Sequence, residues 1–156
     1  MFRHVGVPSL NIHTIKLSPR RTLYAFDQLK QEEEQEAIGH FNDECFVLSC
    51  GVRTFPNAKV AANLARDTAV WAYTHLRTKS TYQEDKRLLV HRIFRTTNMA
   101  LFQKRKETGF DAGIAATLAI SIVSDQMLWI GSIGDSRIYI GRAGVLRRVT
   151  RNRLSS

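Results

Sequence analysis

A four-residue corner between two apolar runs is the feature that most constrains how this chain can fold. Its residues are Gly134, Asp135, Ser136 and Arg137. The flanking runs, residues 127–133 and 138–140, are short and rich in β-branched and aromatic residues, which predicts a strand on each side of the corner. A glycine-bounded turn at 141–144 leads into a further apolar run at 145–149. This succession predicts an antiparallel meander in the last part of the chain.

Before the meander, the pattern of apolar residues predicts one strand and one helix. Residues 46–50 form a short apolar run that ends at Gly51, which is typical of a strand followed by a turn. Pro56 and Asn57 then open a helix that we expect to reach about Arg77. Its predicted apolar stripe consists of residues at helical spacing: Val60, Ala61, Leu64, Ala65, Thr68, Trp71 and Ala72.

A capping-box signal predicts a second helix. Thr81 and Glu84 have the Ser/Thr-x-x-Glu spacing, so we expect a helix to begin there and to end near Gly109. Its apolar side is formed by Leu88, Leu89, Ile93, Ala100 and Leu101. Residues 115–123 are again apolar and β-branched, and residues 124–126 predict a turn. This order of elements predicts an α+β domain with helices on one face of an antiparallel sheet.

The first 40 residues are weakly patterned, and we divide the chain into this segment and a domain over residues 41–156. Residues 22–26 are β-prone and predict an early strand. The acidic run at residues 32–36 predicts a surface loop or a short helix, because charged side chains prefer water. The N-terminal segment is therefore expected to supply, at most, the first strands of the domain.

Composition narrows the classes of protein. The chain has 156 residues and no apolar run of about 18, so we expect one domain, no membrane span and a cytoplasmic location. The net charge is +9, but the cations are not interleaved with aromatic residues, which argues against a nucleic-acid-binding surface. Cys45 and Cys50 are the only cysteines and have no histidine cluster nearby, so we expect reduced thiols and no zinc site.

Three segments, taken in order, resemble the type 2C (PPM-type) family of metal-dependent serine/threonine protein phosphatases. The first is the strand at 46–51 with the helix entry at 57–62, where the family has Asp-Gly-x-Gly-Gly after a strand. The second is Ala-Thr-Leu at 116–118, where the family has a Gly-Thr-Thr or Gly-Ser-Thr cluster. The third is the corner at 134–137 with the strands that follow it to Thr-Arg at 150–151.

The resemblance implies a fold and a metal-dependent chemistry. The family fold is a layered sandwich of antiparallel sheets flanked by helices, which we expect to be incomplete at the C-terminus of this chain. Family members hydrolyse phosphoserine or phosphothreonine esters with two Mn²⁺ or Mg²⁺ ions that bridge a water. Carboxylates hold these ions, because hard cations take anionic oxygen ligands. The corner is structural in the family, and Asp135 fits a turn acid that bonds nearby backbone N–H groups.

The sequence departs from the family where the metal ions would bind. Cys50 stands at the position of the bridging aspartate. Gly51, whose backbone carbonyl would be a ligand, is kept. The Gly-x-Gly-Gly portion is replaced by residues 52–55, which include the cation Arg53. The strand that carries the centre of the family's site therefore offers a thiol where a carboxylate is expected.

The family's other acidic ligands also lack clear counterparts. The candidates for the upstream positions are Asp27, with Arg21 as the accompanying arginine, and Glu44. The Asp-His pair that follows the last strand in the family is replaced by Asn-Arg at 152–153. Two further aspartates of the family would lie beyond the C-terminus of this chain. We therefore expect impaired binding of Mn²⁺ or Mg²⁺ and assign no catalytic residue.

These departures leave several functions open. One is an inactive type 2C phosphatase-like protein, a pseudophosphatase, that acts in phospho-signalling by binding a phosphoprotein or a kinase. Another is an active Mn²⁺- or Mg²⁺-dependent phosphatase in which other residues replace the missing ligands. A third is a basic nucleic-acid-binding module. An incomplete domain also predicts self-association through an exposed sheet edge.

Overall fold

The computed structural model describes residues 10–18, 21–28, 36–108 and 113–150, with side chains from residue 36 onward. The chain divides into two compact units, residues 1–34 and residues 35–156. The first unit contains an antiparallel hairpin of β1 (Leu10–Ser18) and β2 (Arg21–Gln28). The strand predicted at residues 22–26 is confirmed by β2.

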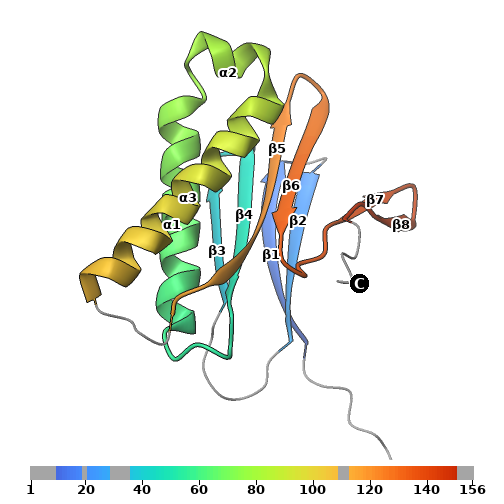
Figure 1. Cartoon of the computed structure of the whole chain (residues 1–156). Coiled ribbons are helices and arrows are strands. Elements are labelled where there is room, and N and C mark those ends of the chain that lie inside the picture. The colour runs from blue at the N-terminus through green and yellow to red at the C-terminus, as the bar shows by residue number, and fades with distance from the viewer. Residues whose placement is uncertain (1–9, 19–20, 29–35, 109–112, 151–156) are drawn as a thin grey trace, which may run out of the picture. The chain divides into compact units, whose positions relative to one another are not determined.

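The second unit is built on a four-stranded antiparallel sheet with two long helices on one face (Figure 1). In spatial order the strands are β3 (Glu36–Phe41), β4 (Cys45–Gly51), β5 (Ala116–Ser124) and β6 (Met127–Ile133). The helices are α1 (Ala58–Leu76), the short α2 (Ser80–Glu84) and α3 (Lys86–Thr108). A separate hairpin follows, formed by β7 (Tyr139–Arg142) and β8 (Val145–Arg148). The predicted combination of helices and antiparallel sheet is confirmed.

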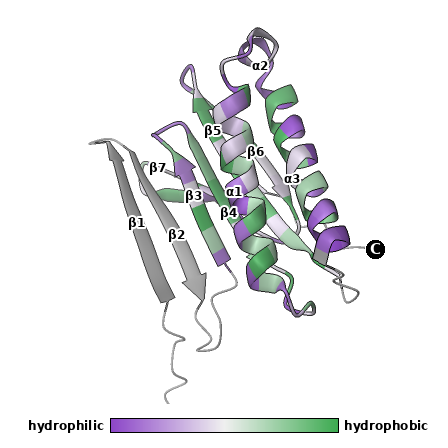
Figure 2. Ribbon diagram, turned by 90° about the vertical axis from the view of Figure 1, so that its left-hand side faces the viewer, coloured by the Kyte–Doolittle hydropathy of each residue, from purple (hydrophilic) through white to green (hydrophobic). Residues whose placement is uncertain are grey.

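The hydrophobic core lies between the sheet and the helices. Alternate residues of β4 and β5 point toward α1 and α3 and pack against their buried side chains. The core consists of Cys45, Val47, Ala69, Ala72, Tyr73, Leu89, Ile93, Leu118, Ile120 and Ile122. In Figure 2, which is coloured by hydropathy, most of β4 and β5 has the colour of hydrophobic residues. The residues that alternate with the core members, such as Leu48 and Cys50, face away from the helices.

Small residues allow α1 to lie close to the sheet. Its buried face is formed by Ala58, Ala61, Ala62, Ala65, Ala69, Ala72 and Tyr73. On β3, a Cβ at Gly39 would lie 2.8 Å from Cγ of Arg66 and 2.9 Å from Cγ2 of Val70. The predicted apolar stripe is therefore partly wrong. Val60 and Trp71 are 41% and 55% exposed, because the alanines and not the larger residues turn toward the sheet.

The second predicted helix is interrupted at Asp85. The predicted start at Thr81 is wrong, because α2 is a separate five-residue helix that already begins at Ser80. The Asp85 carboxylate accepts hydrogen bonds from the backbone N–H groups of Arg87 at 2.8 Å and Leu88 at 3.1 Å. These bonds satisfy donors at the start of α3 and so cap that helix. None of the described helices is long and apolar enough to cross a membrane.

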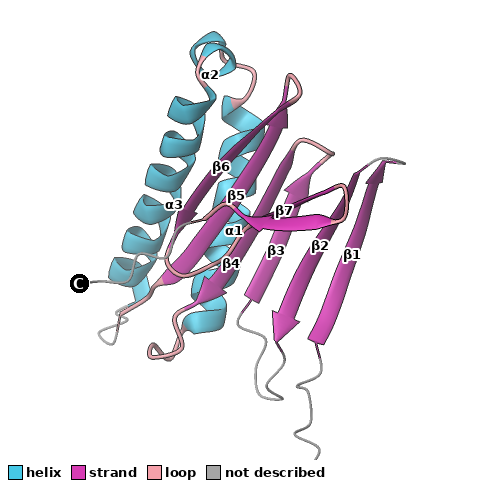
Figure 3. Ribbon diagram, turned by 90° about the vertical axis from the view of Figure 1, so that its right-hand side faces the viewer, coloured by secondary structure: helices cyan, strands magenta, loops and turns pink. Residues whose placement is uncertain are grey.

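The predicted meander is divided between two sheets, because among the described strands β6 pairs with β5 and β7 pairs with β8. A tight turn connects the two strands of each pair. Asp125 and Gln126 have φ values of 52° and 62°, and Ala143 and Gly144 have φ values of 51° and 76°. Two-residue turns with both residues in the left-handed region match the twist of antiparallel strands. The β5–β6 and β7–β8 pairs are joined in this way. The β7–β8 hairpin lies on the side of the sheet that faces away from α1 and α3 (Figure 3).

The start of β3 differs from the sequence prediction. Within the acidic run at residues 32–36, only Glu36 is described, and it is the first residue of β3 instead of part of a loop or short helix. The proposed division between residues 40 and 41 falls inside this strand. β3 pairs with β4 along its whole length, from Glu36 opposite Cys50 to Phe41 opposite Cys45. Glu36 is thereby placed beside the strand that carries Cys50.

Candidate functional site at the end of strand β4

Side chains from four parts of the chain meet at the end of β4. In the register of the sheet, Cys50 stands opposite Glu36 of β3 on one side and Thr117 of β5 on the other. All three lie on the face away from the helices, because the residues that alternate with them belong to the helix-facing core. Ser136 joins them from the corner after β6, with its Oγ 2.9 Å from Oγ1 of Thr117. We name Glu36, Cys50, Thr117 and Ser136 the Cys50 cluster.

The Gly-Asp-Ser-Arg corner is held in place by two threonines. Gly134 has a φ of +95°, and a Cβ there would lie 2.6 Å from Cγ2 of Thr117, so the position requires glycine. After the corner, the backbone N–H of Ile138 donates to Oγ1 of Thr150 at 3.1 Å. The two charged residues of the corner, Asp135 and Arg137, are exposed. These contacts give the corner a structural task, namely to bring the Ser136 hydroxyl to β5.

Gly51, the candidate backbone ligand, is required for packing. A Cβ at this position would lie 1.9 Å from the carbonyl oxygen of Ala58 and 2.3 Å from its carbonyl carbon. The end of β4 therefore touches the backbone of the first turn of α1. The next residue, Val52, donates its backbone N–H to the carbonyl of Ala115 at 3.0 Å. Close approach explains a glycine here whether or not an ion binds.

The Cys50 thiol is protonated at neutral pH. Burial raises its pKa to about 11, and the negative charge of Glu36 acts in the same direction. Hydrogen bonds with Thr117 and Ser136 lower the pKa but do not outweigh burial. Cys45, at the other end of β4, faces the core, and burial followed by the charge of Glu44 raises its pKa to about 12. Since the thiolate is the reactive form, neither cysteine is an activated nucleophile.

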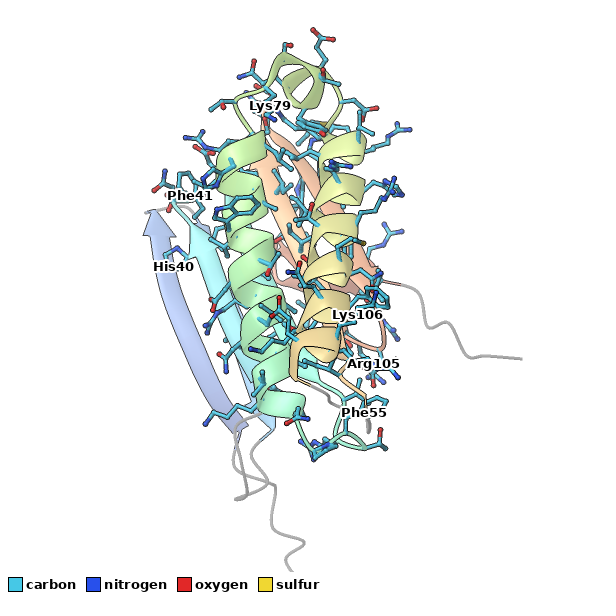
Figure 4. All side chains as sticks on the ribbon, turned by 60° about the vertical axis from the view of Figure 1, so that its left-hand side comes forward. His40, Phe41, Phe55, Lys79, Arg105 and Lys106 are labelled. Atoms are coloured by element: carbon cyan, nitrogen blue, oxygen red, sulfur yellow. The ribbon has the colours of Figure 1, made fainter. Side chains whose placement is uncertain are left out.

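Glu44, a candidate ligand, lies at the opposite end of β4 and is engaged in packing. Its Oε2 accepts a hydrogen bond from the Tyr73 hydroxyl at 2.9 Å and lies 3.4 Å from Nη1 of Arg77. The Arg77 guanidinium also lies over the Phe41 ring, whose position at the end of β3 is labelled in Figure 4. Glu44 lies in the turn before β4, and the extended strand separates it from Cys50 by roughly 20 Å. The structure therefore does not bring Glu44 to the Cys50 cluster.

The remaining candidate positions stay predictions or lie on exposed loops. Asp27 lies on β2, where it pairs with Asn11 of β1 in the first unit, and its side chain lies outside the described part. The same holds for Arg21 at the start of β2. Residues 152–153 also lie outside the described residues. Arg53 is exposed on the loop after β4.

The donor set of the Cys50 cluster does not fit a pair of Mn²⁺ or Mg²⁺ ions. It offers one carboxylate, a protonated thiol and two hydroxyls, whereas these hard cations need several anionic oxygen ligands. Among the described side chains, no group of three or more His, Cys, Asp or Glu residues could hold a metal ion. Glu36 is the acid that the sequence prediction missed. Only the pairing of β3 with β4 reveals its place beside Cys50.

Comparison with solved structures identifies the fold. The serine/threonine phosphatase PstP/Ppp of Mycobacterium tuberculosis matches 92% of this chain and 54% of its own, with a TM-score of 0.66 and 19% identity. Stp1 of Staphylococcus aureus matches 96% of this chain and 57% of its own, with a TM-score of 0.65 and 18% identity. A further PstP structure, a catalytic domain in complex with 2 manganese ions, matches 91% of this chain and 54% of its own, with a TM-score of 0.64 and 19% identity.

The likeness extends over nearly all of this chain but little more than half of each solved phosphatase. No protein-family model and no curated protein matches the sequence. At these identities the likeness shows the fold, and it agrees with the resemblance carried by the corner and by the strand before Gly51. The chain therefore has the fold of part of a type 2C serine/threonine phosphatase domain.

Proposed function

We propose that this chain is a type 2C phosphatase-like domain that binds phosphorylated protein, or the kinase that produces it, without hydrolysing the phosphate ester. One observation carries the proposal. Where the resemblance places the bridging aspartate, the chain has Cys50, whose thiol is protonated and whose neighbours supply a single carboxylate. The fold supports a task in phospho-signalling, because the solved structures that it matches are serine/threonine phosphatases.

Positive charge supports binding of a phosphorylated partner. The net charge of the chain is +9, and phosphorylation adds close to two negative charges to the partner. Exposed cations line α3: Arg87, Arg92, Arg95, Arg105 and Lys106. Figure 4 shows Arg105 and Lys106 pointing outward from the last turns of that helix. A surface of this kind attracts phosphate groups and acidic segments over several ångströms.

The first test is phosphate release from a mixed set of phosphoserine and phosphothreonine peptides, with Mn²⁺, with Mg²⁺ and with a chelator. We expect no metal-dependent release by the natural chain or by Cys50→Asp. That change adds only one carboxylate beside Glu36, whereas two hard cations need several anionic oxygen ligands. Electron paramagnetic resonance of Mn²⁺ separates absent metal binding from absent turnover. Chelator-sensitive turnover by either protein would overturn the proposal.

The second test is binding. Fluorescence anisotropy compares labelled phosphopeptides with their unphosphorylated counterparts at low and at physiological salt. We expect tighter binding of the phosphorylated form and a smaller difference at higher salt, because salt screens the attraction between charges. A duplex nucleic acid serves as the control anion. Equal affinity for both peptide forms, or for the nucleic acid, would contradict a site for phosphorylated protein.

Glu36 favours the alternative of an active enzyme with substituted ligands. It is a carboxylate directly across from Cys50, where it could contribute one ligand to a metal ion. This alternative makes a separate prediction in the phosphate-release assay. If the natural chain shows turnover, Glu36→Gln should abolish it, whereas Glu44→Gln at the opposite end of β4 should not.

A further inference from the structure

Strand β6 forms an edge of the four-stranded sheet. It pairs with β5 from Met127 opposite Ser124 to Ile133 opposite Leu118. Among the described residues no strand pairs with its other side. An edge of this kind presents unpaired backbone donors and acceptors, which a second extended chain can use to add a strand.

A pocket of about 320 Å³ lies between this edge strand and α3. Its apolar lining includes Val90 and Phe94 from the helix and Trp129 and Ile133 from the strand. The two elements are closest at Gly131, where a Cβ would lie 2.6 Å from Cε2 of Phe94 and 2.7 Å from Cγ1 of Val90. The volume is at the lower end of the range of roughly 300–1,000 Å³ for small-molecule sites, which suits one or two amino-acid side chains.

The pocket lining includes one arginine and one histidine. Arg87 and His91 are four residues apart on α3, so they lie on the same side of the helix, and both are exposed. Among the residues that the structure describes, no acidic one lines the pocket. An occupant with carboxylates beside an apolar residue complements this lining. A second copy of this chain does not, because each copy carries a net charge of +9.

We propose that β6 and the pocket bind an extended acidic segment of another protein. The segment pairs its backbone with the free side of β6. It places one large apolar side chain between Phe94 and Trp129, and its carboxylates lie toward Arg87 and His91. This inference goes beyond the proposed function and does not depend on it, because no phosphate group is needed for the binding.

The fluorescence of Trp129 reports on the pocket directly. The chain has two tryptophans, and the other one, Trp71, is exposed on α1, where its ring centroid lies 4.4 Å from that of His75. In a Trp71→Phe background, the emission of Trp129 is measured during titration with an unphosphorylated peptide of about six residues, the usual length of a strand. The peptide contains one leucine flanked by glutamates. We expect a saturable change in emission, and none with a peptide in which lysines replace the glutamates.

Two charge reversals on the same helix form a matched pair. Arg87→Glu should weaken binding of the acidic peptide by about tenfold, because it places a negative charge at the pocket. Arg92→Glu changes the net charge equally, but Arg92 does not line the pocket, so it should change binding by less than about twofold. Equal weakening by both variants would overturn the proposal, since it would indicate general attraction between charges.

A change at the strand tests the pocket independently of charge on the helix. Ile133 is 56% exposed, so Ile133→Ser should leave the fold intact and weaken peptide binding by removing an apolar wall. Sedimentation velocity without peptide examines the other occupant. A dimer that Ile133→Ser converts to a monomer would show that the edge binds a second copy of this chain, and would overturn the proposal. The absence of saturable change in Trp129 emission would also overturn it.

Discussion

At both ends of strand β4 a cysteine lies near a carboxylate, but the carboxylates have different partners. At one end, Cys45 points into the core, and the adjacent Glu44 accepts a hydrogen bond from the Tyr73 hydroxyl at 2.9 Å. At the other end, Cys50 points away from the helices and stands opposite Glu36, which comes from the neighbouring strand. The first carboxylate fixes the end of the helix α1 to the sheet, whereas the second lies beside a protonated thiol.

The difference shows that a short distance in sequence is a poor guide to a shared site in a sheet. Glu44 lies in the turn directly before β4, and the extended strand holds it roughly 20 Å from Cys50. Glu36 is 14 residues before Cys50 in the sequence, and the pairing of β3 with β4 makes it a direct neighbour. At the Glu44 end the carboxylate contacts Tyr73 and Arg77, which join α1 to the sheet, whereas at the Cys50 end the one described carboxylate of the Cys50 cluster lies beside a thiol.

The largest expected effect would come from Gly51, at the Cys50 end of β4. Gly51→Ala should lower the free energy of unfolding by about 3 kcal/mol, the upper part of the usual range for overpacked positions. The reason is steric, because the added Cβ would stand 1.9 Å from the Ala58 carbonyl oxygen and force β4 or α1 to move. Urea unfolding followed by circular dichroism measures the change.

Gly141 in β7 provides the matched control. A Cβ there meets its nearest described atom, Cδ1 of Leu146, at 3.8 Å, which is an ordinary contact. Gly141→Ala should therefore change the free energy of unfolding by no more than about 0.5 kcal/mol. Equal stability of the Gly51→Ala and Gly141→Ala variants would remove the structural explanation for glycine at the end of β4.

A smaller effect is expected at the Glu44 end of the strand. Tyr73→Phe and Glu44→Ala should each cost about 1 kcal/mol in the free energy of unfolding, because each removes one partner of the 2.9 Å hydrogen bond between them. The double variant should cost less than the sum, since the same bond is lost only once. Glu36→Gln, on β3 beside the far end of β4, should be additive with Tyr73→Phe. Additivity for the Tyr73 and Glu44 pair would mean that the two side chains do not interact.

Helices and strands with regularly spaced apolar residues could be predicted from the sequence. The residues at which they begin and end were harder to predict. The helix predicted from Asn57 to about Arg77 is found at Ala58–Leu76, because its small and apolar residues recur at helical spacing over five turns. The break at Asp85 could not be predicted in the same way. The capping-box spacing from Thr81 is satisfied in the sequence, but the hydrogen bonds of the Asp85 carboxylate start the long helix later.

The candidate site could be predicted only where it lies on a recognisable strand. Cys50 is placed correctly relative to the fold because the apolar run before Gly51 predicts β4. Glu36 was missed because its strand begins within an acidic run, in which the alternation of apolar and polar residues that predicts a strand is absent. Its place beside Cys50 depends on the register between β3 and β4. This register is a property of the two strands together, so neither segment alone predicts it.

The smallest expected effect concerns the reactivity of Cys50. At pH 8, a pKa of about 11 instead of 9.0 should slow alkylation by iodoacetamide roughly 100-fold relative to an ordinary thiol, since less thiolate is present. Burial is the main cause, and the Glu36 charge is the next. Glu36→Gln removes that charge and should therefore lower the pKa and speed alkylation several-fold. Mass spectrometry of the modified peptide follows the reaction at each cysteine separately.

Cys45 is the internal control for this measurement, because it is 0% exposed and should stay unmodified in both proteins. The same pKa shift predicts a dependence of stability on pH. A thiol whose pKa is higher in the folded chain contributes stability that is present below pH 9 and is lost as the pH rises toward 11. Glu36→Gln should make that loss less steep. An unchanged rate of alkylation of Cys50 in Glu36→Gln would show that the Glu36 carboxylate does not affect the pKa of the thiol. Glu36 would then not belong to the Cys50 cluster.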